Sequence, residues 1–177
     1  QDLNETVSNS KKYLFKPLKM TATSTESQKY EAYAYNEVSI MRQTHLASKI
    51  KIKINNEIKM KELICDGVLV STSAGSTAYN LSAHGSILPL DSNILALTPI
   101  SAFRPRRWRG ALLSESNKIE LNILDNKDRS SSVTADNVEF RNIEKVNISS
   151  SNENICTVLF DSKHSIEDKI LNEQFNF

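Results

Sequence analysis

Glycine, proline, cysteine and tryptophan are all scarce in this 177-residue chain, which has four, four, two and one of them respectively. So little Gly and Pro excludes a collagen-like chain or a low-complexity tract. Two cysteines, each beside an apolar residue, are too few for a disulfide framework or a cysteine-based metal site. We therefore expect Cys65 and Cys156 to be buried free thiols in a reducing compartment.

Strong net charge and long apolar runs are also missing. With a net charge of +1 the chain has no global field to attract nucleic acid or acidic lipid. An apolar stretch such as residues 94–97 is far shorter than the roughly 20 residues that cross a bilayer. Because no charged-then-apolar leader is visible, we expect a cytoplasmic location without a membrane partner. The chain opens with Gln1 and not Met, and residues 1–10 are polar and unpatterned, which suggests further sequence upstream.

Most of the chain has the pattern of β-strands. Over residues 48–55, isoleucine and lysine alternate, as in a half-buried strand, and Asn55 and Asn56 then predict a hairpin turn. Two helices are predicted, over residues 76–83 and 165–174. Many short strands predict a mainly β, antiparallel sandwich-like fold. The predicted strands are residues 17–24, 30–41, 48–55, 57–63, 67–71, 94–98, 118–124, 131–135, 145–149 and 155–160.

Three of the four glycines fall in one window, residues 66–85. The window contains an Asp-Gly turn, a short apolar strand, a loop of small residues and a short predicted helix that Ser73 or Ser76 could cap. Little side-chain bulk lets a ligand approach the free N–H groups at the helix start. The window is neither a Walker loop nor a dinucleotide fingerprint. A tight strand-to-helix connection without a ligand remains an alternative.

The window reads D-G-V-L-V-S-T-S-A-G-S-T-A-Y-N-L-S-A-H-G. It resembles the signature of the NAD kinase family, D-G-x-x-x-S-T-P-x-G-S-T-A-Y-x-L-S-A-x-G-P. Ser73 and Ser86 stand where the family usually has proline, which loosens the backbone but removes no contacting group. Asn36 and Glu37 are similar to the family's Asn-Glu motif. The L-T-P-I run at residues 97–100 is similar to the family's L-T-P-I segment. The similarity covers residues 17–160.

The resemblance implies a phosphotransferase that uses ATP or polyphosphate and a divalent cation, with Mg²⁺ expected, to phosphorylate the adenosine ribose 2′-hydroxyl of NAD. It implies that Asn36 bonds an adenine edge and that carboxylates accept from ribose hydroxyls or amides. The implied NAD-binding residues are Asn36, Glu37, Asp66, Thr77, Ala78, Tyr79, Asn80, Leu81 and Ser82, with Asp136 a further candidate. Local roles remain as alternatives: a strand-end contact for Asn36, a turn for Asp66 and packing for Tyr79.

The resemblance also implies a fold, the β-rich C-terminal domain of the NAD kinase and diacylglycerol kinase-like proteins. The family's Gly-Gly-Asp-Gly motif, which carries the catalytic aspartate, has no counterpart because the chain contains no Gly-Gly pair. We therefore expect residues 1–16 to be a remnant or linker of a missing α/β domain, with residues 1–15 the tail of its last helix. Residues 17–177 would form the NAD-binding domain. A fragment, a split-gene product and a decayed copy all fit this, and each predicts negligible activity for the chain alone.

The densest basic segment is R-P-R-R-W-R at residues 104–109. Without a wider basic face it predicts contacts with carboxylates, a neighbouring subunit or a phosphate, and not nucleic-acid binding. We expect a dimer or tetramer, as in the family. Two other function classes remain open: a non-catalytic dinucleotide-binding or assembly module, and the C-terminal half of a related lipid kinase. His45, His84 and His164 form no metal or hydrolase constellation.

Overall fold

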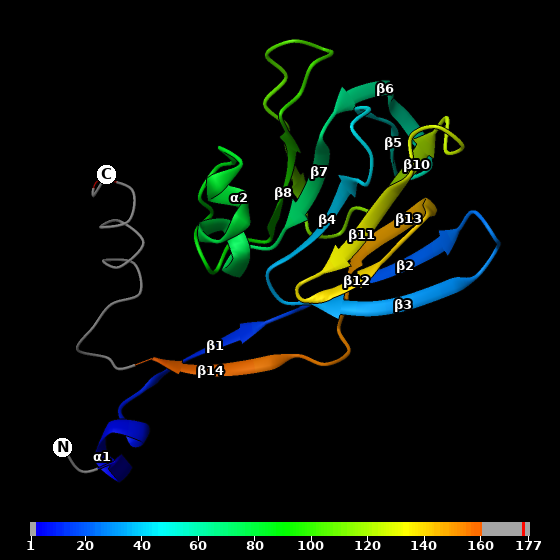
Figure 1. Ribbon diagram of the computed structural model, residues 1–177. Coiled ribbons are helices and arrows are strands. Elements are labelled where there is room, and N and C mark those ends of the chain that lie inside the picture. The colour runs from blue at the N-terminus through cyan, green and yellow to red at the C-terminus, as the bar shows by residue number, and fades with distance from the viewer. Residues whose placement is uncertain (1–2, 161–174, 176–177) are drawn as a thin grey trace.

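The computed structural model describes residues 3–160 and 175. Two six-stranded antiparallel sheets form a sandwich, and a separate two-stranded ribbon extends from it (Figure 1). The mainly β, antiparallel prediction is confirmed. The predicted helix over residues 165–174 lies outside the described residues. Within the described part of the chain, no helix is both long and apolar enough to cross a membrane.

The first sheet has the strand order β3-β2-β13-β10-β5-β6. Its strands show why the alternating pattern works: in β5 every second residue is buried, so the isoleucines face the core and the lysines face outward. Asn55 and Asn56 both have positive φ, which confirms the predicted hairpin turn between β5 and β6. The strand bounds are β2 Leu18–Ser24, β3 Lys29–Ala34, β5 Ser48–Ile54, β6 Glu57–Cys65, β10 Ile119–Leu124 and β13 Ile143–Ser150.

The second sheet has the order β12-β11-β4-β7-β8-β9 and carries the candidate site. Strand β7 is buried along its whole length. Val68 and Val70 belong to the core shared by the two sheets. Leu69 points to the opposite face of its sheet, and the helical segment that follows β7 contacts this strand. The strand bounds are β4 Glu37–Arg42, β7 Gly67–Ser71, β8 Ile94–Ile100, β9 Ala111–Ser114, β11 Ser131–Ala135 and β12 Val138–Phe140.

The ribbon pairs β1 (Lys11–Phe15) with β14 (Cys156–Phe160) and follows the short helix α1 (Leu3–Ser8). The expectation of a helix through residue 15 is therefore wrong beyond Ser8. Ser10 turns the chain by donating its side-chain O–H and its backbone N–H to the Val7 carbonyl. Of the two free thiols, Cys65 is buried as expected, whereas Cys156 is only partly buried because it lies in this ribbon.

The single strand predicted over residues 30–41 is two strands in the structure. Residues 30–41 split into β3 and β4, which belong to different sheets, and the chain passes between them at Tyr35 and Asn36. The crossing brings the Asn-Glu pair to one end of the second sheet. The short strands β9 and β12 at the two edges of this sheet were not predicted, because their patterns are too brief.

Candidate functional site

The site lies where β4 and β7 run side by side, with Glu37 opposite Ser71 in the register. The chain leaves β7 into a 3₁₀ turn, η1 (Ala74–Thr77), and then a single turn of α-helix, α2 (Tyr79–Ser82). Figure 1 shows α2 in green beside β7 and β8. The predicted continuous helix over residues 76–83 is interrupted at Ala78, whose ψ of −128° is not helical.

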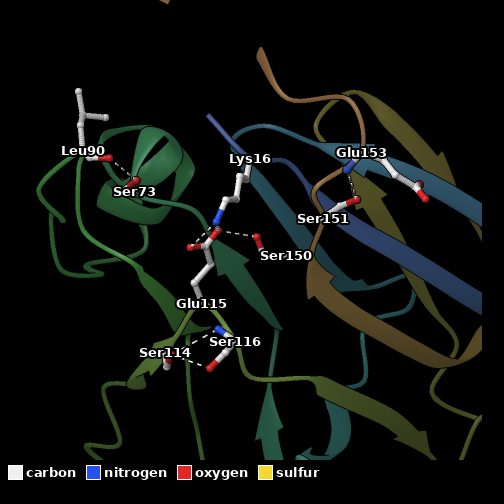
Figure 2. Close-up of polar contacts among 9 residues, drawn as sticks. All are labelled: Lys16, Ser73, Leu90, Ser114, Glu115, Ser116, Ser150, Ser151 and Glu153. Atoms are coloured by element: carbon white, nitrogen blue, oxygen red, sulfur yellow. Dashed lines mark hydrogen bonds and ion pairs between the residues drawn. The ribbon is translucent and has the colours of Figure 1, made fainter. Parts of the chain in front are cut away.

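The predicted capping by serine is also wrong, since neither turn has a side-chain cap. The Ser73 hydroxyl instead donates to the Leu90 carbonyl (3.1 Å), as Figure 2 shows. Ser76 is buried, donates to the Ser73 carbonyl (2.8 Å) and accepts from the Leu88 N–H (3.0 Å). Both serines therefore fasten the small-residue loop to the segment before β8, and do not serve the helix start.

Thr72 joins the loop to the Asn-Glu pair. Its Oγ1 donates to the Tyr35 carbonyl (2.6 Å) and accepts from the Gly75 N–H (3.1 Å), while its own N–H donates to the Asn36 carbonyl (3.0 Å). Gly75 lies so close to this crossing that a Cβ would stand 2.2 Å from the Asn36 carbonyl oxygen. Glycine at position 75 is therefore required for the loop to dock on Asn36.

Asp136 holds the same crossing from the other side. Its Oδ2 accepts from the Tyr35 N–H (2.7 Å), and its Oδ1 accepts from the N–H groups of Asn36 (3.0 Å) and Glu37 (3.2 Å). A carboxylate that accepts three backbone N–H bonds fixes the backbone firmly. The structure thus places Asp136 where it positions the Asn-Glu pair.

Glu37 is the most unusual group of the site. It is half-buried, and its Oε2 is fully buried without a hydrogen-bond partner among the described residues. Burial raises the pKa of the Glu37 carboxyl, and the neighbouring Asp136 charge raises it further. The side chain of Asn36 beside it is exposed and makes no hydrogen bond within residues 3–160. A buried acceptor without a donor next to an exposed amide is an arrangement that a ligand hydroxyl would complete.

Tyr79 lies between Glu37 and Asp66, which are at opposite ends of the β4–β7 pair: Glu37 is opposite Ser71, and the Arg42 N–H donates to the Asp66 carbonyl. Burial raises the pKa of the Tyr79 hydroxyl, and the charges of Glu37 and Asp66 raise it further. The same hydroxyl is 3.6 Å from the Met41 sulfur on β4. Asp66, between β6 and β7, accepts at Oδ1 from the Arg42 Nε at 2.6 Å, so it is part of an ion pair as well as of the site's rim.

Asn80 has a different position from the other predicted residues. It is fully buried, and its Nδ2 donates to the carbonyls of Ser76 (3.0 Å) and Ser86 (2.9 Å). Its Oδ1 accepts from the Thr98 hydroxyl at 2.7 Å. Because both ends of the amide are hydrogen-bonded inside the protein, the Asn80 side chain supports the loop and is not free to contact a ligand.

The remaining predicted residues surround α2. Ala78 and Ser82 are exposed, and Thr77 and Leu81 are partly buried. The structure therefore places Asn36 and Glu37 at one end of the β4–β7 pair and Asp66 at the other, with Tyr79 of the Thr77–Ser82 stretch between them. Among residues 3–160 and 175, no three His, Cys, Asp or Glu side chains are grouped so that they could hold a metal ion.

A polar cluster behind the loop has no signal in the amino-acid sequence. Lys16, which precedes β2, pairs with Glu115 (3.3 Å), and Glu115 accepts from the Ser150 hydroxyl (2.7 Å) (Figure 2). These residues border a cavity of about 100 Å³ together with Ser73 and Ala74. The cluster joins both crossings between the sandwich and the ribbon to the β9–β10 turn, and its two bonded pairs are 99 and 35 positions apart in the sequence.

With the geometry established, comparison with known proteins assigns the family. Residues 35–160 match the model of the ATP-NAD kinase C-terminal domain. The NAD kinase of Xylella fastidiosa (strain Temecula1) is 49% identical over 176 residues, which are 99% of this chain and 68% of that protein. The similarity thus spans about two thirds of this relative's length.

Solved structures agree on the fold. Yeast NADH kinase, complexed with NADH, is similar with a TM-score of 0.83 and 21% identity over 95% of this chain and 49% of its own. An NAD kinase from Archaeoglobus fulgidus, in complex with ATP, has a TM-score of 0.73 and 21% identity, over 91% of this chain and 61% of its own. The chain spans about half of the yeast protein. It belongs to the NAD kinase family and corresponds to that family's C-terminal domain.

Proposed function

We propose that the surface formed by Asn36, Glu37 and Tyr79 binds the adenosine part of NAD and is the acceptor site of an NAD kinase. The observation that carries this proposal is the buried Oε2 of Glu37, which has no hydrogen-bond partner among the described residues and lies beside the exposed amide of Asn36. An acceptor left without a donor costs free energy, and a ribose hydroxyl that donates to it would offset that cost. The names of the relatives support the proposal.

The roles follow from side-chain chemistry. The Asn36 amide both donates and accepts, so it suits an adenine edge. Glu37 accepts from a ribose hydroxyl. Asp66, whose Oδ1 already accepts from Arg42, accepts with its other oxygen from a hydroxyl or amide elsewhere on the dinucleotide. The Tyr79 ring provides a flat wall. The side of the site that carries Tyr79 is also lined by Thr77, Ala78, Leu81 and Ser82, which let the ligand come close to the backbone. Asp136 and Thr72 hold the backbone of Tyr35 and Asn36 in place.

The complete enzyme, by this proposal, transfers a phosphoryl group from ATP or polyphosphate to the 2′-hydroxyl, in the cytoplasm and as a dimer or tetramer. Residues 17–177 are its NAD-binding domain, and residues 1–16 are a remnant or linker of an N-terminal domain. The divalent cation of the reaction finds no ligand set among the described residues, so no step proposed for them depends on it. No described residue is proposed as catalytic, and we expect negligible NADP formation from NAD and ATP by residues 1–177 alone.

Calorimetric titration with NAD tests the proposed site. We expect saturable binding by the chain and about tenfold weaker binding by Asn36→Ala, which corresponds to about 1.4 kcal/mol. The matched control is Asn147→Ala, an exposed asparagine on β13 in the other sheet, which should leave the affinity unchanged. Absence of binding at millimolar NAD by folded protein would contradict the proposal, and so would equal loss in both variants.

A further inference from the structure

The ribbon formed by β1 and β14 is joined to the sandwich by two short stretches of chain. Residues 16–17 lead from β1 into β2, and residues 151–155 lead from β13 into β14; we call these two stretches the ribbon root. In the described part of the chain, β1 and β14 pack mainly on each other, and Figure 1 shows the ribbon extending away from the sandwich. A two-stranded ribbon has little stability of its own, so its direction depends on how the ribbon root is held.

Glu115 is bonded to both sides of the ribbon root. Its carboxylate lies 3.3 Å from the Lys16 Nζ and accepts from the hydroxyl of Ser150, the last residue of β13, at 2.7 Å (Figure 2). The Glu115 side chain is 19% exposed, so water weakens these contacts less than those of a fully exposed ion pair. The Glu115 N–H donates to the Asn93 carbonyl (2.9 Å), and the carboxylate is therefore itself held on the sandwich.

A second attachment of the ribbon root comes from Tyr35. Its hydroxyl donates to the Asn154 carbonyl, 119 positions later in the chain, over 2.6 Å. The backbone of Tyr35 is fixed independently, because its N–H donates to Asp136 (2.7 Å) and its carbonyl accepts from Thr72 (2.6 Å). One residue therefore joins the ribbon root to the crossing that carries the Asn-Glu pair.

The two stretches of the ribbon root are also bonded to each other. The N–H of Ser151 donates to the Pro17 carbonyl (2.9 Å), and both residues are buried. The Ser151 hydroxyl accepts from the Glu153 N–H at 3.0 Å (Figure 2). The Glu153 carboxylate pairs with Lys19 (3.6 Å) and accepts from Tyr33, but it is 67% exposed, so these contacts contribute less. The ribbon root therefore moves as one unit, and Glu115 and Tyr35 are its better shielded attachments.

We propose that Glu115 and Tyr35 are positioning residues that hold the ribbon at one angle to the sandwich. Glu115 fixes the ribbon root to the β9–β10 turn, and Tyr35 fixes it to the crossing beside Asn36. What the ribbon carries is thereby kept at a constant place relative to the candidate dinucleotide site. That this is an N-terminal domain rests on the function proposed above; there the angle matters, because a misplacement of about 1 Å can slow a transfer reaction roughly a hundredfold.

Double electron–electron resonance between a spin label on the ribbon and one on the sandwich measures this angle. The labels are attached at Thr157→Cys on β14 and Lys61→Cys on β6, both at exposed positions. Cys156 is changed to serine, and Cys65 stays unlabelled because it is buried and burial raises the pKa of its thiol to about 12. We expect one narrow distribution of distances for this labelled parent protein.

Glu115→Ala with Tyr35→Phe removes both attachments and leaves the backbone bonds of the ribbon root in place. We expect the distance distribution to become at least twice as wide, with each single variant in between. The matched control, Glu139→Ala with Tyr30→Phe, removes an exposed ion pair and a local hydroxyl bond outside the ribbon root, and should leave the width unchanged. Urea denaturation verifies that every variant is folded.

Exchange of the two charges separates positioning from a general loss of stability. Lys16→Glu with Glu115→Lys rebuilds the ion pair in reverse, and Lys at position 115 can still donate to the Ser150 hydroxyl, so the parent's width should return. The proposal is overturned if the parent distribution is already broad, if the double variant keeps the parent's width, or if the control or the charge exchange broadens it as much. No NAD is needed for these measurements, so their outcome is independent of the test of the proposed function.

Discussion

The Thr72 hydroxyl donates to the carbonyl of Tyr35, 37 positions earlier in the chain, over 2.6 Å. This bond joins the small-residue loop to the crossing that carries the Asn-Glu pair. The same hydroxyl accepts from the Gly75 N–H, so one side chain sets the distance between the two halves of the candidate site.

Thr72→Val keeps the shape of the side chain and removes the hydroxyl. The Tyr35 carbonyl and the Gly75 N–H then lose their partner, and we expect a loss of about 2 kcal/mol in unfolding free energy. NAD should bind about tenfold more weakly because the loop no longer docks on Asn36. Urea denaturation and calorimetry measure the two effects. Thr72→Ser retains the hydroxyl and should restore most of both; failure to do so would show that the methyl group matters more than the bond.

Asp136→Asn tests the other support of the crossing. Asparagine tolerates the positive φ of 49° at this position, so the change removes charge and one acceptor oxygen with little backbone strain. Three backbone N–H groups then share one acceptor, and we expect about 1–2 kcal/mol lower stability together with weaker NAD binding. Unchanged stability and affinity would remove Asp136 from the account.

Glu37 makes the stability of the folded protein depend on pH. Because its pKa is raised in the folded protein, folding favours the protonated form, and this contribution to stability is lost as pH rises through the folded-state pKa. Glu37→Gln should therefore melt about 1–2 °C higher than the parent at pH 7. The difference should vanish near pH 4, where the parent carboxyl is protonated as well. Thermal melts across this range check the sign, and a variant less stable at pH 7 would contradict it.

Asn80→Ala tests whether the buried Asn80 amide supports the loop. The substitution leaves the Thr98 hydroxyl without its acceptor and two carbonyls without their donor in a fully buried place, so we expect a loss of about 3 kcal/mol. Ser82→Ala, on the same helical turn but exposed, should cost less than about 0.5 kcal/mol. Chemical denaturation compares the two. Similar stabilities for both variants would mean that the buried amide does not hold the loop.

Much of the sandwich could be predicted because burial of one strand face leaves a period of two in the sequence. Strand β5 alternates because only one of its faces is buried, and β7 is apolar throughout because both of its faces are buried. The prediction that Asn36, Glu37, Asp66 and Tyr79 belong to one binding site depended on a family resemblance. Nothing in their local patterns indicates a shared site.

The errors share a cause in non-local contacts. The strand predicted over residues 30–41 is broken at Tyr35, whose carbonyl accepts from the Thr72 hydroxyl and whose N–H donates to Asp136, 101 positions away. Ala78 interrupts the predicted helix where the loop turns toward β8. Lys16 and Glu115 meet only in the folded chain. Partners so far apart in sequence leave no periodic trace that composition or spacing could show.

The most direct measurement is a crystal structure of the chain with NAD. The account predicts adenosine density against Asn36, with a ribose hydroxyl within hydrogen-bond distance of the Glu37 carboxylate and the Tyr79 ring alongside. Ordered NAD density in the cavity lined by Arg107, Trp108 and Arg109, or on the outer face of the other sheet, with the Asn36 amide untouched, would contradict it.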